Sequence, residues 1–524
     1  MCYLNNTNAF IEHNQTMSDT WKIERDSCPK ISWGHFNPLF ESGALKMRDL
    51  TKFAFIRHPE ERFASFYLDK CLRANLCENC TSIRCVSKLV YDRLSSIARN
   101  QSNYRKDDPQ QWFEWHAAPQ TWNCDFHENL LDFHLIPIGT APEERKLAMR
   151  KLQKVLDFAG VPQVHIEKIV RDTETGDTAH STYDSEQSDR VLKEIRDDPY
   201  IRHYLHHTYY HDYVAFGFNM TEILGNASVY YLTRSKIDKI DKEQLPGENI
   251  LDFIPPFIPI LNDYQVSTGY NLLGCNIRKS MSQLTFNIMC YLNNTNAFIE
   301  HNQTMSDTWK MERDSCPNIS WTHFNPVFES GALKMEDLTK FAFIRHPEER
   351  FASFYLDKCL RSNKCENCRD IRCVSKMVYD RLSFVAQNQS NYQKDDRRMW
   401  FEWHVAPQTW NCDFHENLLD FHLIPIGTAP EERKLAMRKL KKVLDFAGVP
   451  QVHIEKVVRD TETGDTAHST YDSEQSDRVL KEIREDPYIR HYLHHTYYHD
   501  YVAFGFNMTE ILGNVVQSKE PMVM

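Results

Sequence analysis

The sequence of 524 residues contains no apolar run of eighteen residues, the length that a helix needs to span a bilayer. Its apolar segment from Phe253 to Pro259 is too short and too rich in proline for that purpose. Met1 to Asn5 has neither the basic flank nor the apolar core of a secretory signal. The formal net charge of −11 excludes a general binder of nucleic acid or of membrane surfaces, which needs a basic footprint. An anionic ligand must therefore be held by a local cluster of cations.

The sequence is rich in two features of the secretory pathway. Its fifteen cysteines fit an oxidising compartment. Its eleven Asn-x-Ser/Thr sequons are several times the number expected by chance, so we expect a glycosylating lumen. Because no signal is visible, we expect the start of the chain to be truncated. The sequons lie at Asn5, Asn14, Asn79, Asn100, Asn219, Asn226, Asn293, Asn302, Asn318, Asn388 and Asn507.

Most of the chain is a duplication. Residues 1–226 (copy 1) recur at residues 289–514 (copy 2) with a constant offset of 288 and with most positions identical. A period this long predicts two tandem domains rather than a solenoid of small repeats. The predicted organisation is an incomplete domain at 1–226, a linker at 227–249, a complete domain at 250–514 and a tail at 515–524.

The segment that precedes copy 2 has no counterpart before Met1. It contains an apolar run from Tyr270 to Ile277, which predicts a buried strand, and the helical pattern of Ser280 to Leu292 follows it directly. Since this helix begins inside the segment, Met1 corresponds to a position in mid-helix. We therefore expect copy 1 to lack its first strand.

The loop between this strand and helix reads Arg278-Lys279-Ser280-Met281-Ser282-Gln283. A strand, a loop with lysine and hydroxyl groups, and a helix amino terminus are typical of a phosphate-binding site, because free backbone N–H groups face the anion. The segment from Gly274 to Ser280 partly matches the loop of P-loop enzymes, but the second glycine is absent, which argues against a kinase. The alternative is an ordinary helix cap beside a solvated lysine.

A fifteen-residue stretch, FAFIRHPEERFASFY, occurs at residues 53–67 and again at 341–355. It predicts a short buried strand, a turn at His346-Pro347, and a helix with Pro347 in its first turn. A strand that ends at Arg345 leaves the guanidinium at a sheet edge, where an anionic ligand usually binds. Ser353 lies about two turns into the helix, where its hydroxyl could bind the same anion. The alternative is an ordinary strand-turn-helix with a solvated arginine.

The same stretch resembles the 3′-phosphate-binding motif of the Golgi carbohydrate sulfotransferases. The resemblance implies an α/β, P-loop-like sulfotransferase fold with a central parallel sheet flanked by helices, here as a tandem duplication with the first copy truncated. It also implies that Arg345 and Ser353 bind the 3′-phosphate of the donor 3′-phosphoadenosine 5′-phosphosulfate (PAPS). His346, and His58 in copy 1, depart from the acidic residue usual in the family. The matching residues are Arg345, Pro347, Arg350, Ser353 and Tyr355.

The loop stands 66 residues before Arg345 and is similar to the 5′-phosphosulfate loop of the heparan-modifying branch. By resemblance, Lys279 contacts the leaving phosphate, while Ser280 and Ser282 bind its oxygens. Arg278, a further candidate for donor binding, replaces the usual proline, and Gln283 replaces the second hydroxyl residue.

Sulfuryl transfer needs in-line alignment of donor and acceptor, positive charge and a base that titrates near neutrality, which favours histidine. His323 is the preferred candidate, because it lies where the heparan sulfotransferases have their base. His404 is the alternative, in a segment similar to the chondroitin and dermatan branch. The tryptophans beside it, Trp403 and Trp410, could bind a sugar ring. For either histidine a structural role is the alternative.

Two further features of copy 2, a group of four cysteines and a basic helix, can each be interpreted in two ways. Cys359, Cys365, Cys368 and Cys373 predict disulfides, with a zinc site as the alternative. Copy 2 with Cys275 has eight cysteines and copy 1 has seven, as expected if copy 1 has lost a bridging partner. A predicted helix at residues 430–446 presents basic residues to a glycan or simply to solvent.

The sequence therefore predicts a PAPS-dependent carbohydrate sulfotransferase that needs no metal and acts on a glycosaminoglycan such as chondroitin. By resemblance it belongs in the Golgi lumen, associated with the membrane, and binds no nucleic acid. Copy 1 has Arg57, Ser65, His35 and His116 but no lysine loop, so we expect it to transfer no sulfate. The alternative is a lumenal glycan-binding protein of the same fold that has lost catalysis.

Overall fold

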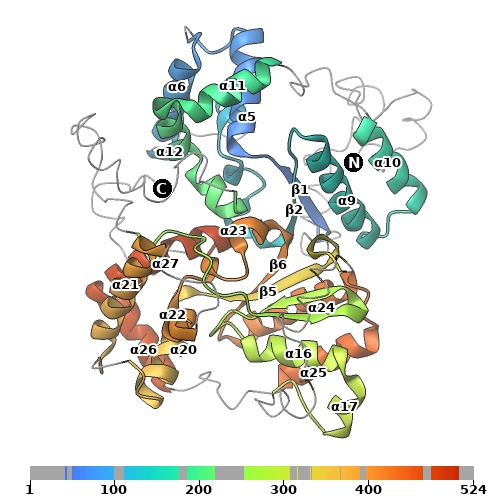
Figure 1. Cartoon of the computed structure of the whole chain (residues 1–524), viewed down its shortest axis with the longest axis vertical. Helices are drawn as coiled ribbons and strands as arrows, with labels where there is room; N and C mark the ends of the chain where they lie inside the picture. Colours follow the sequence, from blue (N-terminus) through green and yellow to red (C-terminus); the bar gives the residue numbers. More distant parts are fainter. Residues whose placement is uncertain are drawn as a thin grey trace.

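The computed structural model describes two α/β units that lie one above the other along the longest axis of the molecule (Figure 1). The upper unit is formed by copy 1 and the lower unit by copy 2. The described residues are 42–43, 46, 50–78, 80–99, 111–175, 186–218, 253–306, 316, 328, 331, 333–365, 368–389, 397–463 and 474–506. The predicted linker and the predicted tail both lie wholly outside them.

Copy 2 is built on a four-stranded sheet of order β3-β4-β5-β6. The strands β4, β5 and β6 are parallel, which confirms the predicted parallel sheet, while β3 pairs with β4 in the antiparallel direction. This edge strand was not predicted. The strands are β3 (Tyr264–Ser267), β4 (Leu272–Cys275), β5 (Thr339–Arg345) and β6 (Phe421–Ile426).

Helices cover both faces of this sheet, so its central strand is apolar throughout. Phe341 and Phe343 of β5 pack with α16 and α24, whereas Ala342 and Ile344 face α27 and copy 1. This burial on both sides explains why β5 is a continuous apolar run rather than an alternating one. The helices of copy 2 are α16 (Ser282–Asn293), α17 (Thr295–Glu300), α20 (Pro347–Phe354), α21 (Ile371–Gln387), α22 (Trp400–Val405), α23 (Phe414–Asn417), α24 (Pro430–Phe446), α25 (Gln451–Thr463), α26 (Glu474–Glu485) and α27 (Pro487–Phe504).

Copy 1 repeats the second part of this fold. Its described residues form a sheet of two strands, β1 (Lys52–Ile56) and β2 (Phe133–Pro137), which match β5 and β6. On β1, Phe55 is 45% exposed, whereas its counterpart Phe343 is buried. The helices are α5 (Pro59–Phe66), α6 (Ile83–Arg99), α7 (Trp112–Ala117), α8 (Phe126–Asn129), α9 (Pro142–Phe158), α10 (Gln163–Thr175), α11 (Glu186–Asp197) and α12 (Pro199–Phe216).

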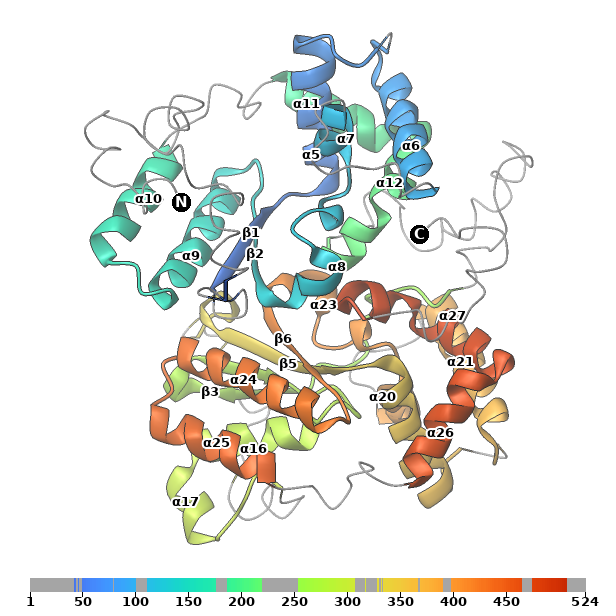
Figure 2. The same cartoon turned by 180° about the vertical axis from the view of Figure 1, so that it is seen from behind.

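The two copies pack through equivalent faces related by a pseudo-twofold axis, and Figure 2 shows α9 and α24 on the same side of the molecule. His134 lies against its own counterpart His422, and Phe158 against Phe446. Lys151 of copy 1 pairs with Asp420 of copy 2, and the equivalent Lys439 pairs with Asp132 at 2.8 Å. This exchange of equivalent pairs is the pattern of a twofold dimer interface within one chain.

The four-cysteine cluster of each copy forms disulfides, as predicted. The bonds in copy 2 are Cys359–Cys365 and Cys368–Cys373. Their equivalents in copy 1 are Cys71–Cys77 and Cys80–Cys85. In copy 2 the first bond anchors η10, a π-helical turn (Tyr355–Arg361) that continues α20.

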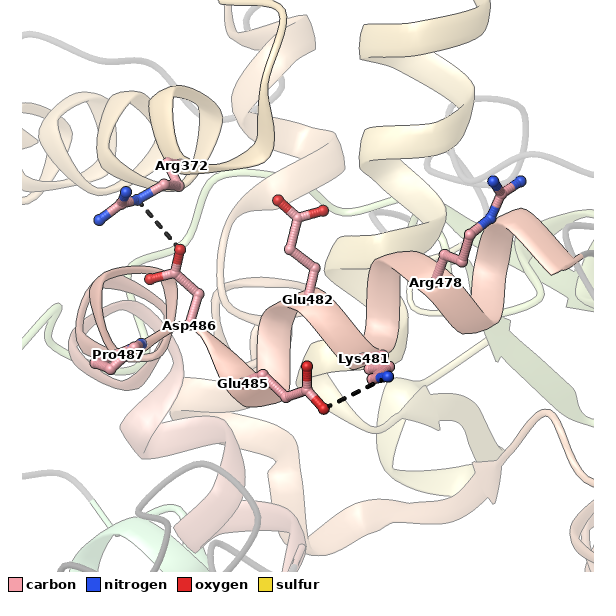
Figure 3. A pocket seen from close by; sticks show the side chains of 7 residues that line it. All are labelled: Arg372, Arg478, Lys481, Glu482, Glu485, Asp486 and Pro487. Atoms are coloured by element: carbon pink, nitrogen blue, oxygen red, sulfur yellow. Dashed lines mark ion pairs between the residues drawn. The ribbon is translucent and has the colours of Figure 1, made fainter.

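A shallow hollow of about 520 Å³ lies where α21, α26 and α27 meet (Figure 3). Arg372 crosses it to pair with Asp486 at 3.2 Å, and Lys481 pairs with Glu485 at 3.8 Å. The predicted site residues do not line this hollow. No helix of the described part of the chain is long and apolar enough to cross a membrane.

Candidate active site

The predicted phosphate-binding loop and Arg345 lie at the same edge of the copy 2 sheet. The loop follows β4, and Arg345 ends β5. Since these strands are parallel neighbours, with Cys275 in register with Ala342, their carboxyl ends meet. The open edge of a doubly covered parallel sheet is the usual place for a ligand in such folds.

The loop has an unusual backbone. Lys279 and Met281 both have left-handed conformations, with φ of 65° and 59°, which non-glycine residues rarely adopt. The helix α16 therefore begins at Ser282, two residues later than predicted. Upstream, a Cβ added to Gly274 would lie 2.7 Å from Thr285 of α16 and 3.0 Å from Phe341. Glycine thus allows strand and helix to approach closely beneath the loop.

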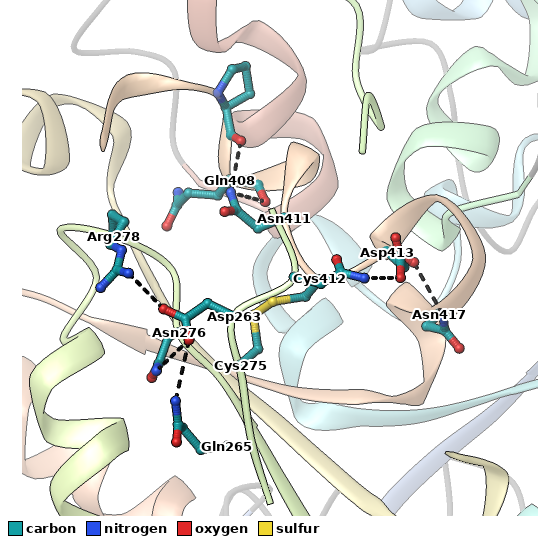
Figure 4. Close-up of a disulfide and its surroundings, with 12 residues drawn as sticks. Asp263, Gln265, Cys275, Asn276, Arg278, Gln408, Asn411, Cys412, Asp413 and Asn417 are labelled. Atoms are coloured by element: carbon teal, nitrogen blue, oxygen red, sulfur yellow. Dashed lines mark hydrogen bonds and ion pairs between the residues drawn. A yellow bond between two sulfur atoms is a disulfide. The ribbon is translucent and has the colours of Figure 1, made fainter. Parts of the chain in front are cut away.

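A disulfide whose pairing the sequence alone did not predict anchors the strand end from which the loop starts. Cys275, the last residue of β4, is bonded to Cys412, as Figure 4 shows. Beside this bond, Arg278 pairs with Asp263 at 2.9 Å. The guanidinium of Arg278 is thus already bound to a carboxylate within the chain. Copy 1 has Cys124, an exposed residue, at the position that corresponds to Cys412.

Gln408, in the 3-10 turn η13 (Gln408–Trp410), links the loop to the end of β5. Its Oε1 accepts hydrogen bonds from the Ser280 hydroxyl and from the Arg345 backbone N–H, each at 2.8 Å. Its Nε2 donates to the Arg345 carbonyl at 2.8 Å. The Ser280 hydroxyl thus donates its proton to Gln408 and helps to hold the loop. Its predicted contact with a phosphate stays a prediction.

Arg350 fixes the same region from α20. Its side chain is buried, and it donates only to backbone carbonyls: Arg278 at 2.9 Å, Ala406 at 2.7 Å and His404 at 3.4 Å. Arg350 thus ties the loop to the segment after α22 and positions both.

Lys279 points to a carboxylate on η10. Its ammonium contacts Asp357, and Lys358 reaches the same carboxylate at 3.0 Å. Burial lowers the pKa of Lys279 to about 8, and the cations Lys358 and Arg345 act in the same direction, whereas Asp357 opposes them. Burial alone would raise the pKa of Asp357, but Lys279 and Lys358 hold it at about 2.

Arg345 lies near enough to Lys279 for the two charges to repel each other. The Arg345 side chain is 15% exposed and pairs with Glu349 at 3.2 Å, its one ion pair within the described residues. Glu349 is held in turn by the Thr428 hydroxyl at 3.2 Å. Ser353 is buried in α20. The two predicted anion sites thus share one edge of the sheet.

His404 belongs to this cluster, whereas His323 lies outside the described residues. The Nδ1 of His404 must donate to the Trp400 carbonyl, 2.7 Å away, which leaves Nε2 as an acceptor. Burial, then Arg278, Lys279 and Lys358, lower the pKa of His404 to about 3, although the Trp400 bond opposes the shift.

The Trp400 ring, 4.5 Å from that of His404, is 38% exposed, and Lys358 lies 5.5 Å above it. The sequence had predicted that Trp403 and Trp410, rather than Trp400, bind a sugar ring. Trp410 is buried and donates to the Pro255 carbonyl at 2.7 Å, so it is a core residue.

Copy 1 repeats the supporting contacts without the loop. Gln120 donates to the Arg57 carbonyl at 2.7 Å, and Arg62 donates to the carbonyls of Ala118 and His116. Among its described residues nothing corresponds to Lys279. The described residues of the whole chain also contain no group of three side chains that could hold a metal ion.

The comparison with known proteins agrees with this architecture. A model of the sulfotransferase family matches residues 1–219 and 262–507. The chain belongs to the sulfotransferase family. This sulfotransferase is 32% identical over 288 residues to carbohydrate sulfotransferase chst-1 of Caenorhabditis elegans, an alignment that covers 53% of the chain and 85% of the relative. It is 26% identical over 265 residues to the uncharacterized protein C18B2.2 of the same organism, covering 49% and 72%. No solved structure matches it.

Sequence reasoning missed two residues of this candidate site, Gln408 and Asp357, and the buried role of Arg350. Gln408 and Arg350 bind backbone groups that come together only in the folded chain. No pattern of side chains in the sequence therefore predicts their contacts. Asp357 could have been noticed, since it lies two residues after the predicted motif.

Proposed function

We propose that the chain transfers a sulfuryl group from PAPS to a hydroxyl group of a glycosaminoglycan such as chondroitin. The observation that carries this proposal is the meeting of Lys279 and Arg345 at one edge of the copy 2 sheet. Two cationic positions on one side suit a nucleotide with phosphate groups at both ends.

The residues present suit such a donor. Lys279, Ser282 and the first turn of α16 would hold the 5′-phosphosulfate, because that turn has backbone N–H groups without helical partners. Arg345 and Ser353 would hold the 3′-phosphate. When bound, PAPS supplies a sulfuryl group on a good leaving group. Lys279 would place its positive charge where the leaving phosphate gains negative charge.

His404 suits the role of base, because its Nε2 is an acceptor beside Lys279. In the chain without an anion, burial and, after it, the cations Arg278, Lys279 and Lys358 keep the imidazole neutral. A bound polyanion would offset those cations and raise the pKa of His404, so that Nε2 could better take a proton from the acceptor hydroxyl. His323 stays a second candidate.

The exposed Trp400 ring supports a sugar acceptor, since a flat aromatic face packs on the apolar side of a pyranose. The relative named carbohydrate sulfotransferase supports the same substrate class. We place the protein in the Golgi lumen, associated with its membrane; the disulfides of both copies support an oxidising compartment. The domain boundaries at 226, 249 and 514 are part of the proposal.

The test is transfer of labelled sulfate from PAPS to chondroitin, dermatan and heparan acceptors by the full chain. Lys279→Met should lower transfer at least about a hundredfold, because a charge at the leaving group acts mainly in the transition state. Lys376→Met, at an exposed lysine paired with Asp380, is the control and should leave transfer unchanged.

Two results would contradict parts of the proposal. Substantial transfer by Lys279→Met would show that copy 1 is active. No transfer to any acceptor, with glycan binding retained and no retention on immobilised adenosine 3′,5′-bisphosphate, would favour a glycan-binding protein without catalysis.

A further inference from the structure

Asp357 sits where an anionic ligand would have to approach Lys279. The side chains of Lys279 and Asp357 are 12% and 10% exposed, so each is largely removed from water. Two more cations surround the carboxylate, and both come from its own π-helical turn η10: Lys358 at 3.0 Å and Arg361 at 3.9 Å. Lys279 is the only one of the three contributed by the loop.

A carboxylate and a phosphate compete for the same ammonium group, because both are acceptors of charge-assisted hydrogen bonds. In a largely buried site the two anions also repel each other strongly. An anion bound by Lys279 therefore excludes the present position of the Asp357 carboxylate. The Asp357 carboxylate must therefore move away from Lys279, or it weakens the binding of the anion there.

We propose that Asp357 is an internal anion that occupies Lys279 until an anionic nucleotide displaces it, and that Lys358 and Arg361 retain the displaced carboxylate. The inference rests on the proposed function, because it concerns regulation of the same donor site. Asp357 then lowers the affinity for the donor and keeps the buried ammonium of Lys279 charged when no donor is bound.

Copy 1 contains an equivalent turn whose aspartate can be compared with Asp357. Its turn η2 (Tyr67–Arg73) has the same sequence and the same π-helical form, but no loop lysine faces it among the described residues. There Asp69 pairs with Lys70 at 2.9 Å and with Arg73 at 3.4 Å. Two cations of the turn itself thus contact the equivalent aspartate.

The charges around Lys279 predict a protonation signature. Asp357 is the neighbour that raises the pKa of Lys279, whereas burial, Lys358 and Arg345 lower it to about 8. Arg278 and the neutral His404 complete the cluster. Without the Asp357 carboxylate the pKa of Lys279 falls further, so at pH 8 the free lysine loses its proton and must regain one when an anion binds.

The experiment is calorimetric titration of the full chain with adenosine 3′,5′-bisphosphate at pH 6.5 and pH 8, in buffers with different heats of ionisation. At pH 6.5 Asp357→Asn should bind the nucleotide about three- to tenfold more tightly than the wild type, because the competing anion is gone. At pH 8 it should take up more protons on binding than the wild type. The matched control is Asp69→Asn in copy 1, which should change neither quantity.

A second variant keeps the test decisive if Asp357→Asn does not fold. Arg361→Met removes an exposed cation that retains the displaced carboxylate, so it should bind about two- to threefold more weakly. Unchanged or weaker binding by a folded Asp357→Asn chain at pH 6.5, or unchanged binding by Arg361→Met, would overturn the inference alone. No binding by the wild type would overturn the donor site itself and the inference with it.

Discussion

At the scale of single residues, the site depends on one buried amide. Gln408 joins Ser280 of the loop to both backbone groups of Arg345, and its own backbone N–H donates to Asp500 at 2.7 Å. Burial raises the pKa of Asp500, although the hydrogen bonds from Gln408 and Thr409 and the charge of Arg350 oppose that shift. An uncharged side chain with both a donor and an acceptor is the only kind that satisfies all these neighbours.

Gln408→Glu tests this. The variant keeps the size but loses the donor to the Arg345 carbonyl and places a carboxylate about 3.5 Å from Asp500. We expect a loss of about 3 kcal/mol in the free energy of unfolding, because a second carboxylate is buried beside Asp500 and the Arg345 carbonyl loses its donor. Urea unfolding followed by tryptophan fluorescence measures it. Gln120→Glu, at the partly exposed counterpart in copy 1, should cost about 1 kcal/mol or less; equal losses would contradict the argument.

At the scale of elements, the phosphate-binding loop is held by its flanks. The disulfide Cys275–Cys412 joins the end of β4 to the segment after η13 across 137 residues. Because both partners lie at the edge of the sheet where the loop begins, the bond limits how far β4 and η13 can separate. The predicted strand and helix were right in kind here, but the left-handed Lys279 and Met281 shortened the helix.

Cys412→Ser should destabilise copy 2 by about 5 kcal/mol, the loss expected when a loop of this length is no longer closed in the unfolded chain. It should also weaken binding of adenosine 3′,5′-bisphosphate, since Gln408 and the loop are then free to move apart. Thermal unfolding and calorimetric titration measure the two effects. Cys124→Ser in copy 1 is the matched control, and a similar loss there would contradict this account.

At the scale of the whole molecule, the duplication produces an internal dimer. The paired contacts Lys151–Asp420 and Lys439–Asp132 are equivalent under the pseudo-twofold axis and are only partly exposed. Lys439 and Lys52 outweigh the burial that would raise the pKa of Asp132 and instead keep it lowered. Tyr210 of α12 also binds His499 of α27 across the interface, at 2.7 Å. Copy 1 thus covers part of copy 2.

The double variant Lys151→Glu with Lys439→Glu places like charges in both equivalent pairs. We expect it to cost about 1–2 kcal/mol per pair, more than an exposed ion pair, and to let the copies separate. Small-angle scattering should report a larger radius of gyration. The control is Lys146→Glu with Lys434→Glu, the same charge change on the same two helices at exposed positions. An equal expansion in the control would exclude a role for the interface pairs.

The sequence by itself determined the duplication, the strand-turn-helix around Arg345, the lysine loop and the local disulfides, because each follows from periodicity or from residues close along the chain. Only the tertiary structure decided the partner of Cys275, the antiparallel strand β3, the bridge through Gln408 and the pairing of Lys279 with Asp357. These contacts join residues far apart in sequence, and their geometry depends on how the sheet brings its strand ends together.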